Sequence, residues 1–198
     1  MSPITHLVLS WVVAAKTTDN PRDCRLVTLA GIAPDLDGAE LVLDIIRNAS
    51  TGGDRFPLYQ NYHHYLLHGL AAGAGLALLA ACLAKRRWRV LVLALAVFHL
   101  HLLCDFVGSR GPSPEDLWPI FYFGPFDKDP MWIWKDQWRL DGWQNLLISL
   151  VVFVWAIAIT LREGHSVVGV VSRRFDAHFV RVLRDWMGKI RSRVAPPA

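Results

Sequence analysis

Charged residues are scarce in this chain. They make up 19% of the 198 residues, whereas 53% are apolar. An ordinary soluble domain is less apolar than this, so the composition argues against a soluble protein. The fraction of charged residues is still too high for a simple membrane channel. The length corresponds to about one domain, and the favoured class is a small polytopic membrane protein.

Cysteine is also rare, and the positions of the three cysteines argue against a disulfide-stabilised fold. Cys82 and Cys104 lie inside apolar runs and Cys24 lies beside a basic segment, so no pair is evident and no disulfide framework is expected. Internal repeats and low-complexity segments are lacking too. The first apolar segment has no basic residues before it, which argues against a cleaved signal peptide.

Three long apolar runs cover residues 69–84, 90–106 and 146–161. Each is slightly shorter than the roughly 20 residues that cross a bilayer, so flanking residues must complete each span. We also expect helices over 4–15 and 22–33, the second followed by a longer acidic, glycine-containing loop. The predicted fold is all-α: a polytopic membrane bundle of about four to five membrane-embedded helices with a C-terminal basic amphipathic helix.

The net charge of +4 indicates a topology once it is mapped on the chain. If the basic turn 85–89 faces the cytoplasm, so do residues 16–25 and everything after 161, and these segments hold 15 of the 21 Lys and Arg but 5 of the 17 acidic residues. The positive-inside rule then places residues 34–65 and 105–143 outside the cytoplasm. We therefore expect a multi-pass protein of the bacterial inner membrane.

The C-terminal residues 165–198 are expected to form a cytoplasmic tail, after a helical membrane domain over 1–164. Apolar residues recur in the tail at helical spacing, with basic residues mostly around the other face. This pattern is typical of an amphipathic helix on an anionic leaflet. The predicted partner is therefore membrane lipid and not nucleic acid, and the oligomeric state stays open.

Ionisable residues within the second long run indicate a site. His101 and Asp105 are four residues apart, so they share one helix face and can bind one cation together. Such residues are costly in a membrane and are functional by default. His99 lies about 200° around the helix from His101, so we expect it to face elsewhere or to support the site.

Other candidate ligands map to the same membrane face. They are His6, Asp35, Asp37, His63, His64 and His68. Imidazole together with carboxylate suits zinc, with manganese or iron as alternatives, whereas calcium and magnesium favour oxygen ligands. The lack of a convincing Cys ligand argues against a purely structural zinc site, and the predicted metal site lies at the non-cytoplasmic face.

The ordered motifs resemble the membrane-bound metal-dependent hydrolases of bacteria and archaea. That family's pattern consists of an early His, PDxD, two histidines five apart, HxxxD, a glycine-containing turn and a WP dipeptide. In this chain the corresponding residues are, in order, His6, Asp35 with Asp37, His63 with His68, His101 with Asp105, Gly108 or Gly111, and Trp118 with Pro119. The resemblance covers about residues 1–120. The chain departs from the pattern at Gly38, where the family often has His, and at His64, where it often has Arg. The order is also distantly similar to zinc-dependent phospholipase C and single-strand nuclease enzymes.

The residues then suggest roles in a metal-dependent hydrolase. Asp105 is expected to bridge metal ions, Asp35 or Asp37 to act as ligand or catalytic base, and Arg110 to hold a substrate anion. Location at the outer membrane surface suggests a phospholipid or isoprenoid phosphate as substrate. The competing hypotheses are a metal-binding transporter or sensor, and a non-catalytic scaffold with a structural metal.

Overall fold

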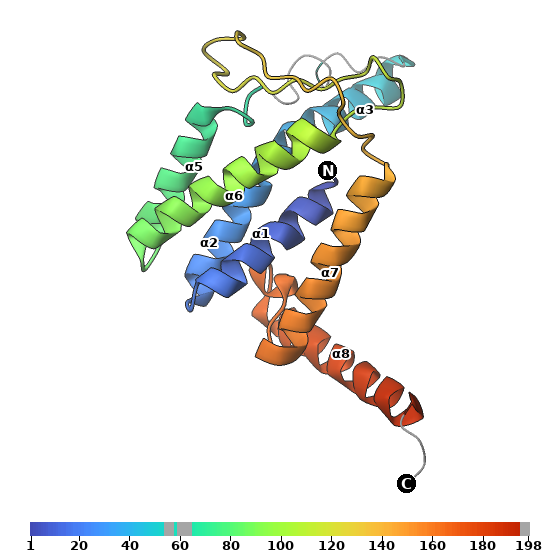
Figure 1. Ribbon diagram of the computed structural model, residues 1–198. Coiled ribbons are helices and arrows are strands. Elements are labelled where there is room, and N and C mark those ends of the chain that lie inside the picture. Colours follow the sequence, from blue (N-terminus) through green and yellow to red (C-terminus); the bar gives the residue numbers. More distant parts are fainter. Residues whose placement is uncertain (54–57, 59–64, 195–198) are drawn as a thin grey trace.

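The computed structural model of the chain describes residues 1–53, 58 and 65–194, and in this part it is helical (Figure 1). The helices are α1 (Pro3–Thr17), α2 (Pro21–Ile32), the 3-10 helix η1 (Ala33–Gly38), α3 (Ala39–Thr51), α5 (Leu70–Leu83), α6 (Arg87–Gly108), α7 (Trp143–Glu163), the 3-10 helix η2 (Val167–Val170) and α8 (Arg173–Val194). No strand occurs among the described residues, so the all-α prediction is confirmed.

Two of these helices are long and apolar enough to cross a membrane. They are α6, with 22 residues, and α7, with 21 residues. The apolar helix α5 is shorter, with 14 residues. The expected total of four to five membrane-embedded helices stays a prediction.

The bundle is built around α1, which packs against α2 on one side and against α7 on another. Ser2 caps α1 by accepting a hydrogen bond from the backbone N–H of Thr5, and Pro3 fits the first turn because its missing N–H needs no partner there. The α5–α6 hairpin packs on α2, and its own two helices approach each other closely at a glycine. At Gly73 of α5 an added Cβ would lie 2.7 Å from the Phe98 ring of α6, so only glycine permits this approach.

The buried carboxylate of Asp23 joins two turns at one end of the bundle. Its oxygens accept the backbone N–H groups of Lys85 at 2.8 Å and Arg86 at 3.0 Å. The turn between α1 and α2 and the turn between α5 and α6 therefore lie at the same level. At this end α8 leaves the bundle, running across the direction of α7 (Figure 1).

The segment predicted as an acidic loop after α2 is partly a helix, so that prediction is wrong for residues 39–51. Its apolar side chains recur at helical spacing and lie exposed, as at Val42 and Ile46, whereas Asp44 on the opposite face is buried. The acidic residues that suggested a loop are the inward face of an amphipathic helix. Gly52, with a positive φ of 68°, ends it.

Candidate metal centre

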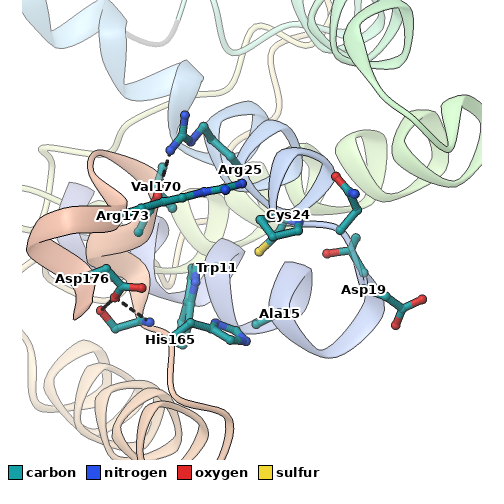
Figure 2. Close-up of a pocket in the computed structure, with 14 residues that line it drawn as sticks. Trp11, Ala15, Asp19, Cys24, Arg25, His165, Val170, Arg173 and Asp176 are labelled. Carbon is teal, nitrogen blue, oxygen red and sulfur yellow. Dashed lines mark hydrogen bonds between the residues drawn. The ribbon is translucent and has the colours of Figure 1, made fainter. Parts of the chain in front are cut away.

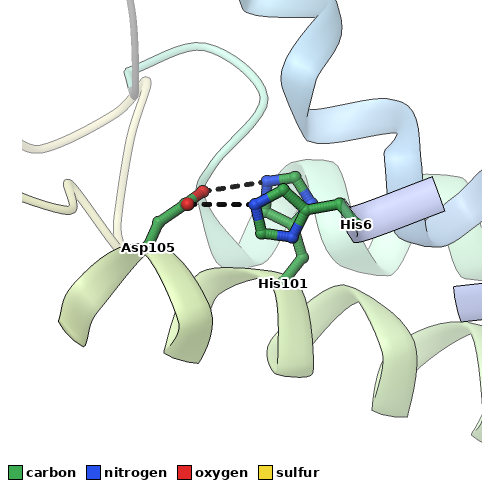
Figure 3. Close-up of side chains that lie close together, drawn as sticks. All are labelled: His6, His101 and Asp105. Atoms are coloured by element: carbon green, nitrogen blue, oxygen red, sulfur yellow. Dashed lines mark hydrogen bonds and ion pairs between the residues drawn. The ribbon is translucent and has the colours of Figure 1, made fainter. Parts of the chain in front are cut away.

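The carboxylate of Asp105 lies at the centre of a buried group of histidines. Asp105 and His101 stand one turn apart on α6, and Nε2 of His101 lies 3.0 Å from Oδ2 of Asp105. Their side chains are 4% and 1% exposed, respectively. Burying a charged group to this extent costs much free energy unless the group has a partner. The predicted i, i+4 pairing on one helix face is present (Figure 3).

The first helix contributes His6 from the other side. Its Nε2 lies 3.1 Å from Oδ1 of Asp105, and its ring stacks on His101 with the ring centroids 3.8 Å apart. Figure 3 shows the two rings stacked one over the other, both facing the carboxylate. The α-amino group of Met1 also reaches Oδ1 of Asp105, at 2.6 Å. Residues nearly a hundred positions apart in sequence therefore share one carboxylate.

Two further candidate ligands approach Asp105 and His101, one from a 3-10 helix and one from a non-helical segment. Asp35 lies in η1, with its Oδ1 3.8 Å from Nε2 of His101. His68 lies just before α5, with its Nε2 3.7 Å from Oδ2 of Asp105. The structure thus brings His6, Asp35, His68, His101 and Asp105 together from four separate segments.

Asp37 lies behind His68 and fixes its position. One carboxylate oxygen of Asp37 is 3.0 Å from Nδ1 of His68, and both oxygens accept the backbone N–H of Leu67. This leaves Nε2 of His68 directed at Asp105. Carboxylates commonly hold metal-binding histidines through the second ring nitrogen in this way.

His101 is held in the same manner by a backbone carbonyl. Its Nδ1 donates to the carbonyl oxygen of Gly31 at 2.8 Å, so its Nε2 carries the lone pair in the neutral ring. Sequence reasoning did not identify Gly31. A side chain at this position would overlap Ser10 Oγ of α1, so the glycine lets α1, α2 and α6 meet beside the site.

The remaining predicted residues have other surroundings. His63 and His64 lie outside the described residues. His99 contacts the hydroxyl of Tyr122 at 3.0 Å and belongs to a separate aromatic group, in line with the expectation that it faces elsewhere. Arg110 donates to the backbone carbonyls of Gln137 and Ser113, and its substrate-binding role stays a prediction.

Two buried amides that sequence reasoning missed fasten the loop after α6. Gln137 donates to the carbonyls of Phe106 and Trp118 and accepts the N–H of Trp118. Asn145, at the start of α7, donates to the carbonyl of Gly108 at 2.7 Å. A single amide in a loop has no sequence pattern, so only the fold reveals this role.

The donor set fits a divalent metal. Ligand atoms around a tetrahedral zinc lie about 3.3 Å apart, given bonds of about 2.0–2.1 Å, and the distances from Asp105 and Asp35 to the histidines range from 3.0 to 3.8 Å. His6, His101 and Asp105 form one possible ligand group, and Asp35, His68 and His101 form another. Oδ2 of Asp35 is buried and has no hydrogen-bond partner among the described residues. A buried carboxylate oxygen without a partner is expected where a metal ion binds.

Two of the candidate ligands have shifted acidities. Burial alone would lower the pKa of His68, but its contacts with the carboxylates of Asp105 and Asp37 outweigh this and raise the pKa to about 9. Burial raises the pKa of Asp35, against the pull of the neighbouring histidines. Asp35 is the most exposed carboxylate of the group, with 15% of its side chain accessible.

The fold and the site together define the class: a helical membrane protein with a candidate His–Asp metal centre buried in its bundle. The family model described as YdjM inner membrane protein matches residues 1–171, and the chain belongs to this family. Membership supports an inner-membrane location, as predicted, and the family's description states no activity. Comparisons with curated proteins and with solved structures gave no significant match.

Proposed function

We propose that this chain is a multi-pass inner-membrane hydrolase that uses a divalent metal, zinc in the first instance, to cleave a phosphate ester. The observation that carries the proposal is the convergence of four candidate ligands, His6, Asp35, His68 and His101, around Asp105 from segments far apart in sequence. Burying so many ionisable groups in a membrane domain is costly, and a bound cation offsets that cost.

The ligands would divide their tasks around Asp105. His6, His68 and His101 would hold metal through the ring nitrogens that face this carboxylate, and Asp105 would supply carboxylate oxygens as further ligands. A bound divalent ion lowers the pKa of water toward neutrality and stabilises charge on a phosphate. Asp35 would serve as the base that accepts a proton, a role that its raised pKa and unpartnered Oδ2 support.

The proposed substrate class rests on the exposed residues around the cluster. Asp35 is partly accessible, and the neighbouring Leu36 is 65% exposed, so the cluster is approached past an apolar side chain. Exposed tryptophans follow in the loop and at the start of α7, among them Trp132 and Trp143, as at a headgroup interface. A phospholipid or isoprenoid phosphate, entering from the non-cytoplasmic leaflet, fits such an opening.

A second candidate function is a non-catalytic metal-binding protein, namely a transporter, a sensor or a scaffold. The observation that favours it is burial, because His6, His68 and His101 are each at most 2% exposed. A closed set of ligands is typical of a structural metal, whereas a catalytic ion keeps a position open for water. The two functions make the same prediction for metal content and different predictions for hydrolysis.

The experiment is elemental analysis of the detergent-purified chain beside His68→Ala and Asp105→Ala. His99→Ala is the matched control, because His99 shares α6 with His101 but contacts Tyr122 instead of the cluster. We expect stoichiometric metal in the wild type and the control, and loss of metal in the other two. The same samples are then assayed with lipid phosphates: phosphate release that requires the metal supports the hydrolase. Metal binding without release favours the second function, and a metal-free wild type that is folded overturns both.

A further inference from the structure

A cavity lies at the opposite end of α1 from the candidate metal centre. It has a volume of about 370 Å³ and is enclosed by the end of α1, the start of α2, η2 and the start of α8. Figure 2 shows Arg173 reaching over it toward the start of α2, with Trp11 and His165 on another side. The predicted topology places this end at the cytoplasmic leaflet.

The cationic groups of the cavity are not neutralised by the chain itself. Neither Arg25 nor Arg173 forms an ion pair with a carboxylate in the described part of the structure. Arg25 donates from Nη2 to the carbonyl of Gly169 at 3.0 Å, and its buried Nε has no partner there. Two guanidinium groups with unused donors favour an anion, and phosphate in particular.

The acidic residues at the cavity are already engaged. Asp176 accepts the backbone N–H and the hydroxyl of Ser166, at 2.8 and 2.6 Å. Asp19 pairs with Arg86 at 2.8 Å and is 78% exposed. Asp176 keeps its negative charge, because its partners are neutral groups. With Asp19 paired to Arg86, Arg25 and Arg173 leave one positive charge in excess at the cavity. The N-termini of α2 and α8, where helix dipoles add positive potential, also lie at it.

The other wall of the cavity is apolar. Trp11 is 1% exposed, and Ala15 and Val170 line the cavity beside it. A free phosphate ion would leave this wall in contact with water, whereas a phospholipid covers it with glycerol and the first part of an acyl chain. The combination of two arginines and an apolar wall thus favours a lipid.

The helix that begins at the cavity presents an uncovered apolar stripe. Its members are exposed by 43–68% and recur at helical spacing, at Phe175, Phe179, Val182, Trp186 and Ile190. The buried residues Asp176 and Val180 face the bundle instead. Residues 173–194 carry seven Lys and Arg against two Asp. This helix matches the chemistry of an anionic leaflet and is continuous with the cavity.

We propose that the cavity between α1, α2, η2 and α8 binds the phosphate group of an anionic phospholipid, while α8 lies on the same leaflet. Arg25 and Arg173 hold the phosphate, and the wall at Ala15 and Val170, backed by the buried Trp11, contacts the apolar part. The site is separate from the metal centre and does not depend on the proposed hydrolysis.

The test compares lipid binding to the full chain and to two double variants, by native mass spectrometry and by thermal stability in detergent. Arg25→Gln/Arg173→Gln removes the cavity charges, and Arg22→Gln/Arg174→Gln removes equal charge from the same two helices outside the cavity. We expect phosphatidylglycerol to bind and raise the melting temperature of the wild type and the control. The cavity variant should bind it at least about tenfold more weakly.

Phosphatidylcholine and inorganic phosphate separate the possible ligands. Phosphatidylcholine should bind much more weakly, and inorganic phosphate at the same concentration should leave the melting temperature unchanged. Equal binding of the two lipids, an equal loss in both double variants, or an effect of inorganic phosphate as large as that of the lipid would overturn the proposal. If the cavity variant unfolds, Arg173→Gln alone decides, because this side chain is exposed.

Discussion

At the scale of single residues, the candidate metal centre depends on what holds each imidazole from behind. His68 is held by Asp37 and His101 by the carbonyl of Gly31, in both cases through Nδ1. Each contact turns Nε2 toward Asp105. The ring therefore loses less freedom when it binds a metal, which is why such supporting groups strengthen binding.

Replacing Asp37 by Asn tests this support. The variant keeps the shape of the side chain and an oxygen for the N–H of Leu67, but it removes the negative charge beside His68. We expect metal affinity to fall about 10- to 100-fold with the fold intact, measured by competition with a chromophoric chelator. His99→Ala should bind as the wild type does. Unchanged affinity in Asp37→Asn would show that Asp37 serves only the turn at Leu67.

Which residues the sequence could reveal depends on whether their role has a local pattern. The pair His101 and Asp105 was predictable because helical spacing places them on one face. The position of Asp37 behind His68 was not, since two nearby carboxylates in PDLD look alike until the turn at residue 67 selects one. Gly31 carries no signal at all, because its role lies in its carbonyl and in the space that it leaves.

At the scale of elements, the early start of α2 brings Asp35 to the site. From Pro21 the chain passes through the 12 residues of α2 and about three residues of the 3-10 helix η1 before it reaches Asp35. These residues span roughly 24 Å, of which the greater rise of the 3-10 turn contributes only about 1.5 Å. The point at which α2 begins, more than the change of helix type, therefore sets Asp35 close to the level of Asp105.

The close approach of α1, α2 and α6 at Gly31 gives a prediction for this packing. In Gly31→Ala the new methyl overlaps the Ser10 hydroxyl and crowds Val97, so α1 must shift. We expect a loss of about 1–3 kcal/mol in the free energy of unfolding, seen as a lower melting temperature by circular dichroism in detergent, together with reduced metal content. Gly75→Ala on α5 is the control, since its added methyl meets nothing within 4 Å. Equal melting temperatures for the two variants would contradict the packing argument.

At the scale of the whole molecule, two ends of one bundle differ in chemistry. The His–Asp cluster lies at one end, and Lys and Arg collect at the other, around the turns joined by Asp23 and along α8. The charge pattern predicted this separation because it needs only the order of the apolar runs. It did not predict the cavity at the basic end, since Arg25 and Arg173 reach the same cavity only because η2 packs against α2 and holds the start of α8 there.

The separation of the two ends predicts the orientation in the membrane. With 15 of 21 Lys and Arg on the side of α8, that side should face the cytoplasm and the loop after α6 should face the other way. In a chain whose three cysteines are replaced by alanine, Glu115→Cys should react with a membrane-impermeant maleimide on intact spheroplasts. Ser192→Cys in α8 should react only after permeabilisation. Both positions are exposed, so access alone decides the labelling. The reverse pattern would place the metal centre at the cytoplasmic face, and any lipid-phosphate substrate would then have to come from the inner leaflet.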